Sequence, residues 1–472
     1  MNKKQHVVTW IFFIFMCFTV SFAYAQGKQA KYVFYFIGDG MGVNQVNGTE
    51  MYFGELEGKI GTTPLCFANF PFATVATSFS ATNGVTDSAA GGTALATGHK
   101  TYNSAIGVDC NKKNIYSIAV QAQQAGRKVG IATSVSIDHA TPAAFYAHQP
   151  SRKMYYEIAT DLSKTGFDFY AGSGFLQPTN PANSNAADIY SLYKQAGYSI
   201  AKGYQDYNLK WNNAEKLILT QADGKDPSSL PYAIDRESDD LTLTQITESA
   251  IRFLTKDKDQ GFFLMVEGGK IDWACHGNDA ATAFHEIADM DNAVKLAYQF
   301  YQQHPDETLI VITADHETGG IVLGKGPYKL NLKALDSQKV SQEKLSALIK
   351  KMRKEKNNQV SWTDIQQLLK KNMGFWNTIT LNKEQEDYLQ KVYEESFSNK
   401  NVKMTKNEYA ENEPLATAAK DILNDIALVG WVSGGHSNGY VPVFAIGAGA
   451  ELFQGRMDNT QIPQRIAKAA QY

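Results

Sequence analysis

The chain has 472 residues, of which 43% are hydrophobic and 20% are charged. This composition excludes a disordered chain, and counts of 37 glycines and 4 cysteines exclude a fibrous or disulfide-dense protein. With 45 basic and 48 acidic residues, a formal charge of −3, the chain has no global charge that would favour nucleic acid as a specific partner or an anionic membrane surface. An anionic ligand would therefore have to be held by local groups.

The first 25 residues predict a secretory signal peptide. Lys3 and Lys4 precede the apolar run 7–22, and small residues end the segment at Ala25. The run is too short to predict a stable membrane anchor. We therefore expect cleavage near Ala25, export to the periplasm or the medium, and a catalytic domain over 26–472.

Three cysteines remain after the predicted cleavage: Cys66, Cys110 and Cys275. Such a sparse, odd set does not predict a disulfide framework, although one pair could form. We expect stability to come mainly from buried apolar residues and from bound metal.

Beyond residue 26, short apolar runs alternate with helical patterns. Strands are predicted at 32–37, 128–133, 167–171, 262–266, 309–313 and 441–446, and helices at 115–124, 244–254 and 280–303. Near-continuous apolar strands are typical of a sheet that is buried on both faces. The sequence therefore predicts an α/β fold, a three-layer sandwich with a mostly parallel mixed sheet built from sequential βα units and helices on both faces.

The stretch from about 325 to 428 differs from the rest of the chain. It carries amphipathic runs rich in Lys, Glu and Gln at 344–356, 364–371 and 383–397, and no strand signal. We interpret it as a helical insertion and not as a second catalytic domain. Its role stays open between a lid near the site, an extended dimer interface and a solvated appendage.

Two motifs with small residues follow the first predicted strand. Asp39 lies between glycines where this strand ends, the edge at which α/β sheets bind ligands. Asp87 and Ser88 begin a run of small residues, and a Ser in the first helical turn lies in the positive field of the helix N-terminus. Taken alone, Asp39 is better explained as a helix cap, and Asp87 or Ser88 is at least as well explained in that way.

The segment from His139 to Arg152 carries groups suited to an oxyanion and a hard cation. Arginine can bind two oxygens of a tetrahedral anion at once, and the Thr141 hydroxyl can complete the coordination shell of Mg²⁺. A single arginine in isolation is more often a solvated surface charge.

Further along the chain, carboxylates and histidines recur at predicted strand ends. Asp272 and His276 are four residues apart, so one helical turn would present both on the same face. The other members are Glu267, Asp315, His316 and His436. Core packing does not explain several such pairs at separate strand ends, so together they predict a metal centre.

These residues occur in motifs that resemble the alkaline phosphatase family over nearly the whole mature chain. In chain order the motifs are Gly38-Asp39-Gly40-Met41-Gly42, Thr86-Asp87-Ser88-Ala89-Ala90, Ala140-Thr141-Pro142 with Ser151-Arg152, Glu267-Gly268 with Ile271-Asp272 and His276, Thr313-Ala314-Asp315-His316-Glu317-Thr318-Gly319-Gly320, and Gly435-His436. The resemblance implies hydrolysis of small phosphate monoesters with broad scope. Family members are often dimeric, so a second copy of the chain is a candidate partner.

The resemblance also implies roles for individual residues. Ser88 resembles the nucleophile that becomes phosphoserine, and Arg152 resembles the guanidinium that clamps two phosphate oxygens. The implied metal ligands are Asp272, His276 and His436 for one Zn²⁺, Asp39, Asp315 and His316 for a second Zn²⁺, and Asp39, Thr141 and Glu267 for a third site that usually holds Mg²⁺. Asp87 is expected beside this site.

Two positions depart from the pattern of some bacterial members. His139 stands where they have Asp, which leaves Zn²⁺, Co²⁺ or Mg²⁺ open at the third site. Trp273 stands where they have Lys and cannot hold phosphate through a charge. Either this change weakens phosphate binding or Trp273 only packs over the mouth of the pocket.

Alternative functions are distinguished by the same residues. Phosphodiesterases with this metal arrangement commonly use Thr as the nucleophile and lack the clamping Arg, so Ser88 and Arg152 favour monoesters. A sulfatase is disfavoured because no Cys/Ser-x-Pro-x-Arg segment surrounds Ser88. The alternative from another class is an exported metal- or phosphate-binding protein without turnover, which a retained nucleophile argues against.

Overall fold

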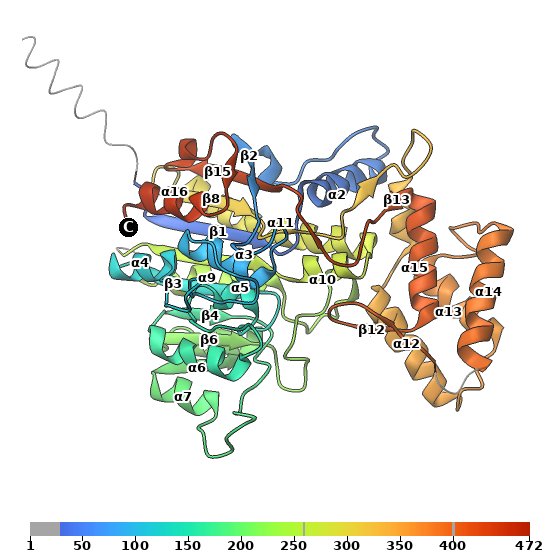
Figure 1. Cartoon of the computed structure of the whole chain (residues 1–472), viewed down its shortest axis with the longest axis horizontal. Coiled ribbons are helices and arrows are strands. Elements are labelled where there is room, and N and C mark those ends of the chain that lie inside the picture. Colours follow the sequence, from blue (N-terminus) through green and yellow to red (C-terminus); the bar gives the residue numbers. More distant parts are fainter. Residues whose placement is uncertain (1–28, 258–259, 399–401) are drawn as a thin grey trace, which may run out of the picture.

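The computed structural model describes residues 29–257, 260–398 and 402–472, and the predicted signal peptide lies outside them. In this described part, no helix is both long enough and apolar enough to cross a membrane. Figure 1 shows a body built around one sheet, with a group of helices from the later part of the chain at one side.

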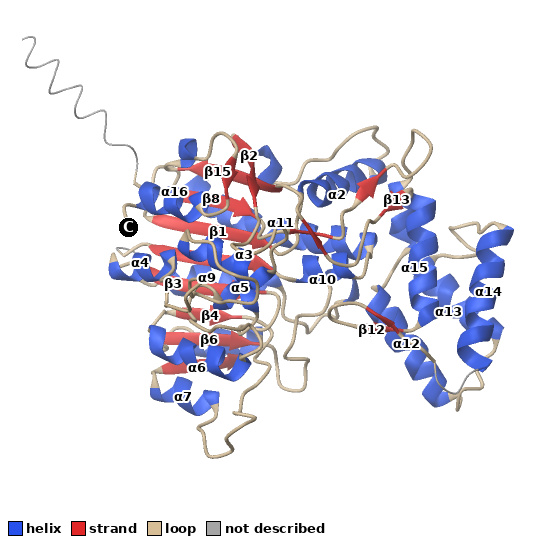
Figure 2. Cartoon of the chain, in the orientation of Figure 1, coloured by secondary structure: helices blue, strands red, loops and turns tan. Residues whose placement is uncertain are grey.

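Ten strands form the central sheet in the order β16-β2-β15-β8-β1-β7-β3-β4-β6-β5 (Figure 2). Their bounds are β1 Tyr32–Gly38, β2 Phe72–Thr77, β3 Lys128–Thr133, β4 Phe169–Ala171, β5 Tyr198–Lys202, β6 Lys216–Thr220, β7 Phe262–Gly268, β8 Thr308–Thr313, β15 Val441–Gly447 and β16 Met457–Asp458. Strand β15 runs antiparallel to both of its neighbours, and the other pairs are parallel. The predicted mostly parallel mixed sheet is confirmed.

All six predicted strands belong to this sheet, but the strand order is not sequential. Strand β1 lies between β7 and β8, which come more than two hundred residues later in the chain. Strands β2 and β5 were not predicted because they lie near the sheet edges and mix exposed with buried positions, so neither forms a continuous apolar run.

Helices cover both faces of the sheet. Neighbouring residues of a strand point to opposite faces, so the contacts of Phe34 and Tyr35 in β1 show which helix covers each face. The Phe34 ring packs 5.5 Å from the ring of Phe300 in α11, whereas the Tyr35 hydroxyl donates to Leu95 O of α3. The helices of this body are α2 Val43–Leu56, α3 Ser88–Thr97, α4 Ile118–Gln124, α5 Ala140–Ala143, α6 Tyr155–Thr165, α7 Ile189–Gln195, α8 Tyr204–Lys210, α9 Leu243–Leu254, α10 Lys270–His276, α11 Ala280–Gln303 and α16 Gln461–Ala470.

The helical stretch after β8 has a hydrophobic cluster of its own. Its helices are α12 Gln342–Glu355, α13 Trp362–Met373, α14 Lys383–Ser398 and α15 Pro414–Ala427. Their buried side chains form a cluster that also takes in Tyr52 of α2 and Phe284 of α11. In Figure 1 these helices lie together at one end of the molecule.

The expectation that the stretch from 325 to 428 carries no strand was wrong. Strands β11 (Thr405–Lys406) and β12 (Glu411–Asn412) form a short antiparallel hairpin between α14 and α15. The strands are only two residues long, too short to produce an alternating pattern in the sequence.

Cys66, Cys110 and Cys275, the cysteines of the described part, are all free thiols in the structure. Cys275 is buried in α10, whereas Cys110 is exposed.

Candidate metal centre

Parallel strands bring the first acidic groups together. Ile37 of β1 is level with Glu267 of β7 and with Thr313 of β8, so Asp39, Glu267 and Asp315 meet at the carboxyl edge of the sheet. All three acids are fully buried. This edge is where open α/β sheets bind ligands.

Asp272, His276 and His436 form the first of three groups whose ligand atoms lie within 4.8 Å of one another. Helix α10 places His276 Nε2 3.3 Å from Asp272 Oδ2. The same nitrogen lies 3.2 Å from His436 Nε2. Nδ1 of His276 lies 2.6 Å from Gly434 O, and Nδ1 of His436 lies 2.9 Å from Thr86 O. Because a carbonyl can only accept, both Nδ1 atoms donate, which leaves both Nε2 atoms free to bind a metal.

The second group consists of Asp39, Asp315 and His316. His316 Nε2 lies 3.3 Å from Asp39 Oδ1 and 3.2 Å from Ser88 Oγ. Its ring stacks 3.6 Å from the ring of His436, so the first and second groups adjoin each other. The predicted nucleophile therefore lies directly beside the second group.

The third group consists of Asp39, His139 and Glu267, and shares Asp39 with the second. The Thr141 hydroxyl lies 3.4 Å from Asp315 Oδ2 of the second group, and it is close enough to Glu267 of the third group to oppose the rise in the pKa of that carboxyl. Burial and the Arg152 guanidinium lower the pKa of His139 to about 3, so its ring is neutral at physiological pH. His139 therefore adds an imidazole to a site that the resemblance predicted from Asp39, Thr141 and Glu267.

Helix α3 presents Ser88 to these groups. Asp87 caps the helix by accepting from Ala90 N at 3.0 Å, and its other oxygen lies 3.4 Å from Arg152 Nη1. Ser88 is thus the first helical residue, where the N-terminal field favours negative charge. A Cβ on Gly91 would come 2.9 Å from Asp315 O, so the glycine permits the helix to approach β8 closely. The structure brings all the predicted site residues to one place.

The buried acids repel one another. Burial and neighbouring acids raise the pKa of Asp39 and of Asp315 well above the ordinary value, and burial raises the pKa of Glu267 to about 7. Asp272 differs, because His276, His436 and His316 hold its pKa well below the ordinary value despite burial. Such a set needs positive charge close by, which bound cations would supply.

Several buried polar atoms of the site have no hydrogen-bond partner among the described residues. They are both carboxylate oxygens of Asp39, Glu267 Oε1, Asp272 Oδ2 and His139 Nδ1. Buried polar atoms are ordinarily satisfied, and unpaired oxygens in an acidic cluster are what metal coordination requires. The residues present therefore fit three bound cations.

Sequence reasoning missed residues that orient the ligands. Thr318 Oγ1 donates to Asp272 Oδ1 and lies 3.2 Å from His316 Nδ1, so one hydroxyl contacts ligands of both the first and the second group. Glu317 accepts from Ser437 Oγ, beside His436. Strand β9 (Glu317–Thr318) pairs with β14 (His436–Ser437), which fixes this contact. The sequence offered one indication of these roles, because Glu317 and Thr318 directly follow the predicted ligand His316.

An aromatic pair borders the site. Trp273 is 9% exposed and stacks on Tyr409, with ring centroids 4.3 Å apart and an angle of 10° between the rings. Tyr409 belongs to the β11–β12 hairpin, and no sequence motif marks it. The prediction that Trp273 packs at the site is consistent with this contact, whereas its effect on phosphate binding stays a prediction.

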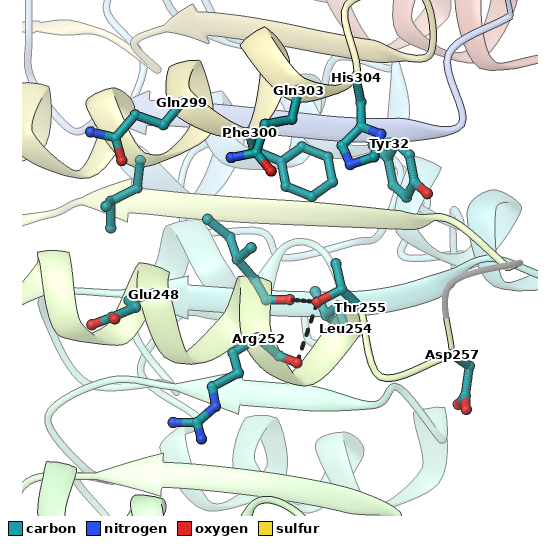
Figure 3. A pocket seen from close by; sticks show the side chains of 12 residues that line it. Tyr32, Glu248, Arg252, Leu254, Thr255, Asp257, Gln299, Phe300, Gln303 and His304 are labelled. Carbon is teal, nitrogen blue, oxygen red and sulfur yellow. Dashed lines mark hydrogen bonds between the residues drawn. The ribbon is translucent and has the colours of Figure 1, made fainter.

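A separate hollow of about 580 Å³ lies between α9 and α11 (Figure 3). Its lining includes Tyr32, at the opposite end of β1 from Asp39, together with Glu248, Arg252 and His304. None of the residues that line it belongs to the three metal-ligand groups. This hollow is therefore separate from the candidate metal centre.

Comparison with known proteins gives a consistent result. Residues 30–170 and 183–472 match the family model described as alkaline phosphatase. Alkaline phosphatase 3 of Bacillus subtilis (strain 168) is 34% identical over 454 residues, which cover 94% of this chain and 90% of that protein.

Two solved structures are also similar. The cold-active alkaline phosphatase of a psychrophilic Shewanella species is 30% identical, with a TM-score of 0.78, over 93% of this chain and 99% of that one. The alkaline phosphatase of the Antarctic bacterium TAB5 is 27% identical, with a TM-score of 0.65, over 95% and 99% of the two chains. With the family model matching nearly the whole described part, this chain belongs to the alkaline phosphatase family and is a phosphoric monoester hydrolase.

Proposed function

We propose that the chain hydrolyses phosphate monoesters in two displacements, with Ser88 as the nucleophile. Ser88 Oγ would attack phosphorus and release the alcohol, and water would then attack the phosphoserine to release inorganic phosphate. The observation that carries the proposal is the place of Ser88, which starts a helix and lies 3.2 Å from His316 of the second metal-ligand group. Two inversions at phosphorus predict overall retention of configuration.

We assign Zn²⁺ to the first and second groups and Mg²⁺ to the third. Histidine with carboxylate is a donor set that suits zinc, whereas carboxylates with the Thr141 hydroxyl suit a harder ion. When bound, two such zinc ions would stabilise the entering and the leaving oxygen of an in-line displacement.

The identity of the metal at the third group is the assignment that most needs measurement, because His139 belongs to that group. A variant of the TAB5 enzyme with one histidine replaced by glutamate has Mg bound in its M3 site. This chain has His139, an imidazole beside Asp39 and Glu267 that would also suit Zn²⁺ or Co²⁺. Elemental analysis of the protein as isolated, and of His139→Asp, tests whether Mg²⁺ content rises with the carboxylate.

The protein's own residues would position the phosphoryl group. Arg152 can donate from two nitrogens to two phosphate oxygens, and its contact with Asp87 at 3.4 Å holds it beside Ser88. Asp87 also accepts from Ser104 N at 2.9 Å, so the acid is itself fixed. Catalysis by positioning and charge acts on the phosphoryl group and makes few demands on the alcohol, which supports broad scope.

The test is hydrolysis of p-nitrophenyl phosphate by the full chain with and without EDTA, with bis-p-nitrophenyl phosphate as the diester. We expect metal-dependent monoesterase activity, a much slower reaction with the diester, and loss of activity on the order of 10³-fold or more in Ser88→Ala. Preference for the diester would favour a phosphodiesterase. Metal binding without turnover would indicate a binding protein, and full activity in Ser88→Ala would contradict the proposed nucleophile.

A further inference from the structure

The β11–β12 hairpin carries Tyr409 at its tip. Asn407 shapes the tip, since its Oδ1 accepts from Tyr409 N at 3.0 Å and from Ala410 N at 2.6 Å. Asn407 N in turn donates to Ala410 O at 3.0 Å. The tip is therefore a closed turn with a defined place for the Tyr409 ring.

The hairpin is fastened to α12 of the helical stretch. Arg353 makes two hydrogen bonds of 2.9 Å to Glu413, which is fully buried just after β12. Glu413 N donates to Ser346 Oγ at 2.8 Å, and Lys350 Nζ donates to Glu411 O at 2.6 Å. A buried ion pair with further hydrogen bonds on both sides holds the position of a short hairpin.

The Tyr409 ring lies against three residues of the site. One face is covered by Trp273 at 4.3 Å between centroids. His276 of the first metal-ligand group packs against it nearly edge-on at 5.4 Å, and His139 of the third group lies at 6.1 Å. Tyr409 is half-buried as a residue, so its ring lies at the border of the site and not in the core.

The stack continues behind Trp273. Lys270 is 3% exposed, with Nζ 4.4 Å from the Trp273 ring, 3.5 Å from the Tyr232 ring and 3.1 Å from Ser229 Oγ. A cation between two aromatic rings, desolvated and hydrogen-bonded, stabilises their arrangement. Trp273 therefore provides a fixed support for Tyr409.

The place of Tyr409 relative to Ser88 indicates which part of the substrate it would meet, an argument that rests on the proposed function. In an in-line displacement the leaving oxygen is opposite the nucleophile. Ser88 lies beside His316 of the second group, so the leaving oxygen would point to the first group. Tyr409 contacts His276 of that first group, and the alcohol attached to the leaving oxygen would lie next to the tyrosine ring.

We propose that Tyr409 is a specificity-determining residue for the leaving group. Its ring is the wall beside which the alcohol of the monoester lies, and it favours aromatic alcohols over small aliphatic ones. Offset or edge-to-face packing of two aromatic rings contributes binding free energy in addition to that from the buried area. A short alkyl chain contributes only through the area that it buries.

The experiment compares phenyl phosphate with ethyl phosphate in the full, metal-loaded chain. For Tyr409→Ala, kcat/KM for phenyl phosphate should fall about 3- to 10-fold more than kcat/KM for ethyl phosphate, and Tyr409→Phe should keep the wild-type ratio. Tyr388→Ala, at an exposed tyrosine of α14, is the matched control and should leave the ratio unchanged. If Tyr409→Ala does not fold, Tyr409→Leu keeps most of the volume without an aromatic ring and serves in its place.

A binding measurement separates recognition from turnover. By calorimetry, the dissociation constant of phenylphosphonate should rise about 3- to 10-fold more than that of methylphosphonate when Tyr409 is replaced by Ala. Equal changes for both ligands, or for both substrates, would overturn the proposal. If the wild type hydrolyses both esters and Ser88→Ala hydrolyses neither, equal changes refute only the role of Tyr409 and leave the proposed function intact. If Ser88→Ala is active, the proposed mechanism fails instead.

Discussion

The edge of the sheet and the helical stretch contribute to the site in opposite ways. The sheet edge gathers four fully buried acids, Asp39, Glu267, Asp272 and Asp315, which belong to three neighbouring metal-ligand groups. The helical stretch contributes an uncharged ring, that of Tyr409, supported by Trp273.

The difference shows what each region needs from the fold. Charged groups at the sheet edge oppose their own burial, so they require compensating charge, which bound cations would supply, and partners such as Thr318. The aromatic pair is stable by packing alone and has no requirement for metal. Changes at the sheet edge should therefore affect turnover of every substrate, whereas changes at the hairpin should affect the choice among substrates.

Metal removal should give the largest effect. We expect EDTA to reduce monoesterase activity to background and to lower Tm, because the ions stabilise only the native state and offset the repulsion among the acids. Asp315→Asn, which removes one of these charges, should lower Tm of the metal-loaded protein but raise Tm of the metal-free protein. Calorimetry with and without EDTA checks both signs, and a lower metal-free Tm in Asp315→Asn would contradict the repulsion argument.

In the metal-free protein, Glu267 should contribute less to stability as pH rises. Burial raises the pKa of Glu267 to about 7, so between about pH 5 and pH 7 this carboxyl holds a proton in the native state that it has already lost in the unfolded chain. Its contribution to the free energy of unfolding should therefore fall across this window, whereas that of His139, whose pKa is lowered to about 3, should rise. Urea unfolding at several pH values measures the slope, and Glu267→Gln should make the slope more positive; an unchanged slope would contradict the contribution of Glu267.

The sequence predicted features that are local in the chain better than contacts between residues far apart in it. Most of the acids and histidines were predicted because they follow a strand whose apolar run is visible, as Asp39 follows β1 and Asp315 follows β8, whereas His436 precedes β15. Thr318 could not be assigned, since its role depends on a contact with Asp272 that only the packed sheet creates. Tyr409 was out of reach because a hairpin of two-residue strands leaves no pattern, and its partner Trp273 is far away in the sequence.

Thr318→Val should have the next largest effect. The substitution keeps the shape but removes the hydroxyl that contacts Asp272 and His316, and loss of such a partner typically costs 10- to 100-fold in metal affinity or activity, so we expect about that range here. Zinc affinity by competition with a chelator is the measurement. Thr247→Val is the matched control, since this buried hydroxyl donates to Leu243 O within α9, away from the metal groups. Equal losses in both variants would indicate a general packing defect.

Breaking the anchor of the hairpin should have a smaller effect on activity. Arg353→Ala leaves the buried Glu413 without its partner, a loss of about 3–5 kcal/mol for a buried pair. We expect faster hydrogen exchange in 405–413 and a reduced preference for phenyl over ethyl phosphate, with kcat/KM for ethyl phosphate within about twofold of wild type.

Lys406→Ala is the control for the anchor, because its ion pair with Glu411 is exposed and contributes little. A comparable fall of kcat/KM for both esters in Arg353→Ala would show that the hairpin supports the metal groups themselves, which would end the distinction between the two regions.

The smallest effect is expected where the two regions meet, at Trp273. A lysine there would add a charge that attracts phosphate, so Trp273→Lys should lower the inhibition constant of inorganic phosphate by a few-fold. The gain should be limited, because the new ammonium would replace a ring that Lys270 Nζ approaches to 4.4 Å, and two cations at such a distance repel each other. The double variant Lys270→Met/Trp273→Lys removes this repulsion and should bind phosphate more tightly than Trp273→Lys. If Trp273→Lys does not lower the inhibition constant, Trp273 acts only by packing. If the double variant binds phosphate no better than Trp273→Lys, repulsion by Lys270 does not limit phosphate binding.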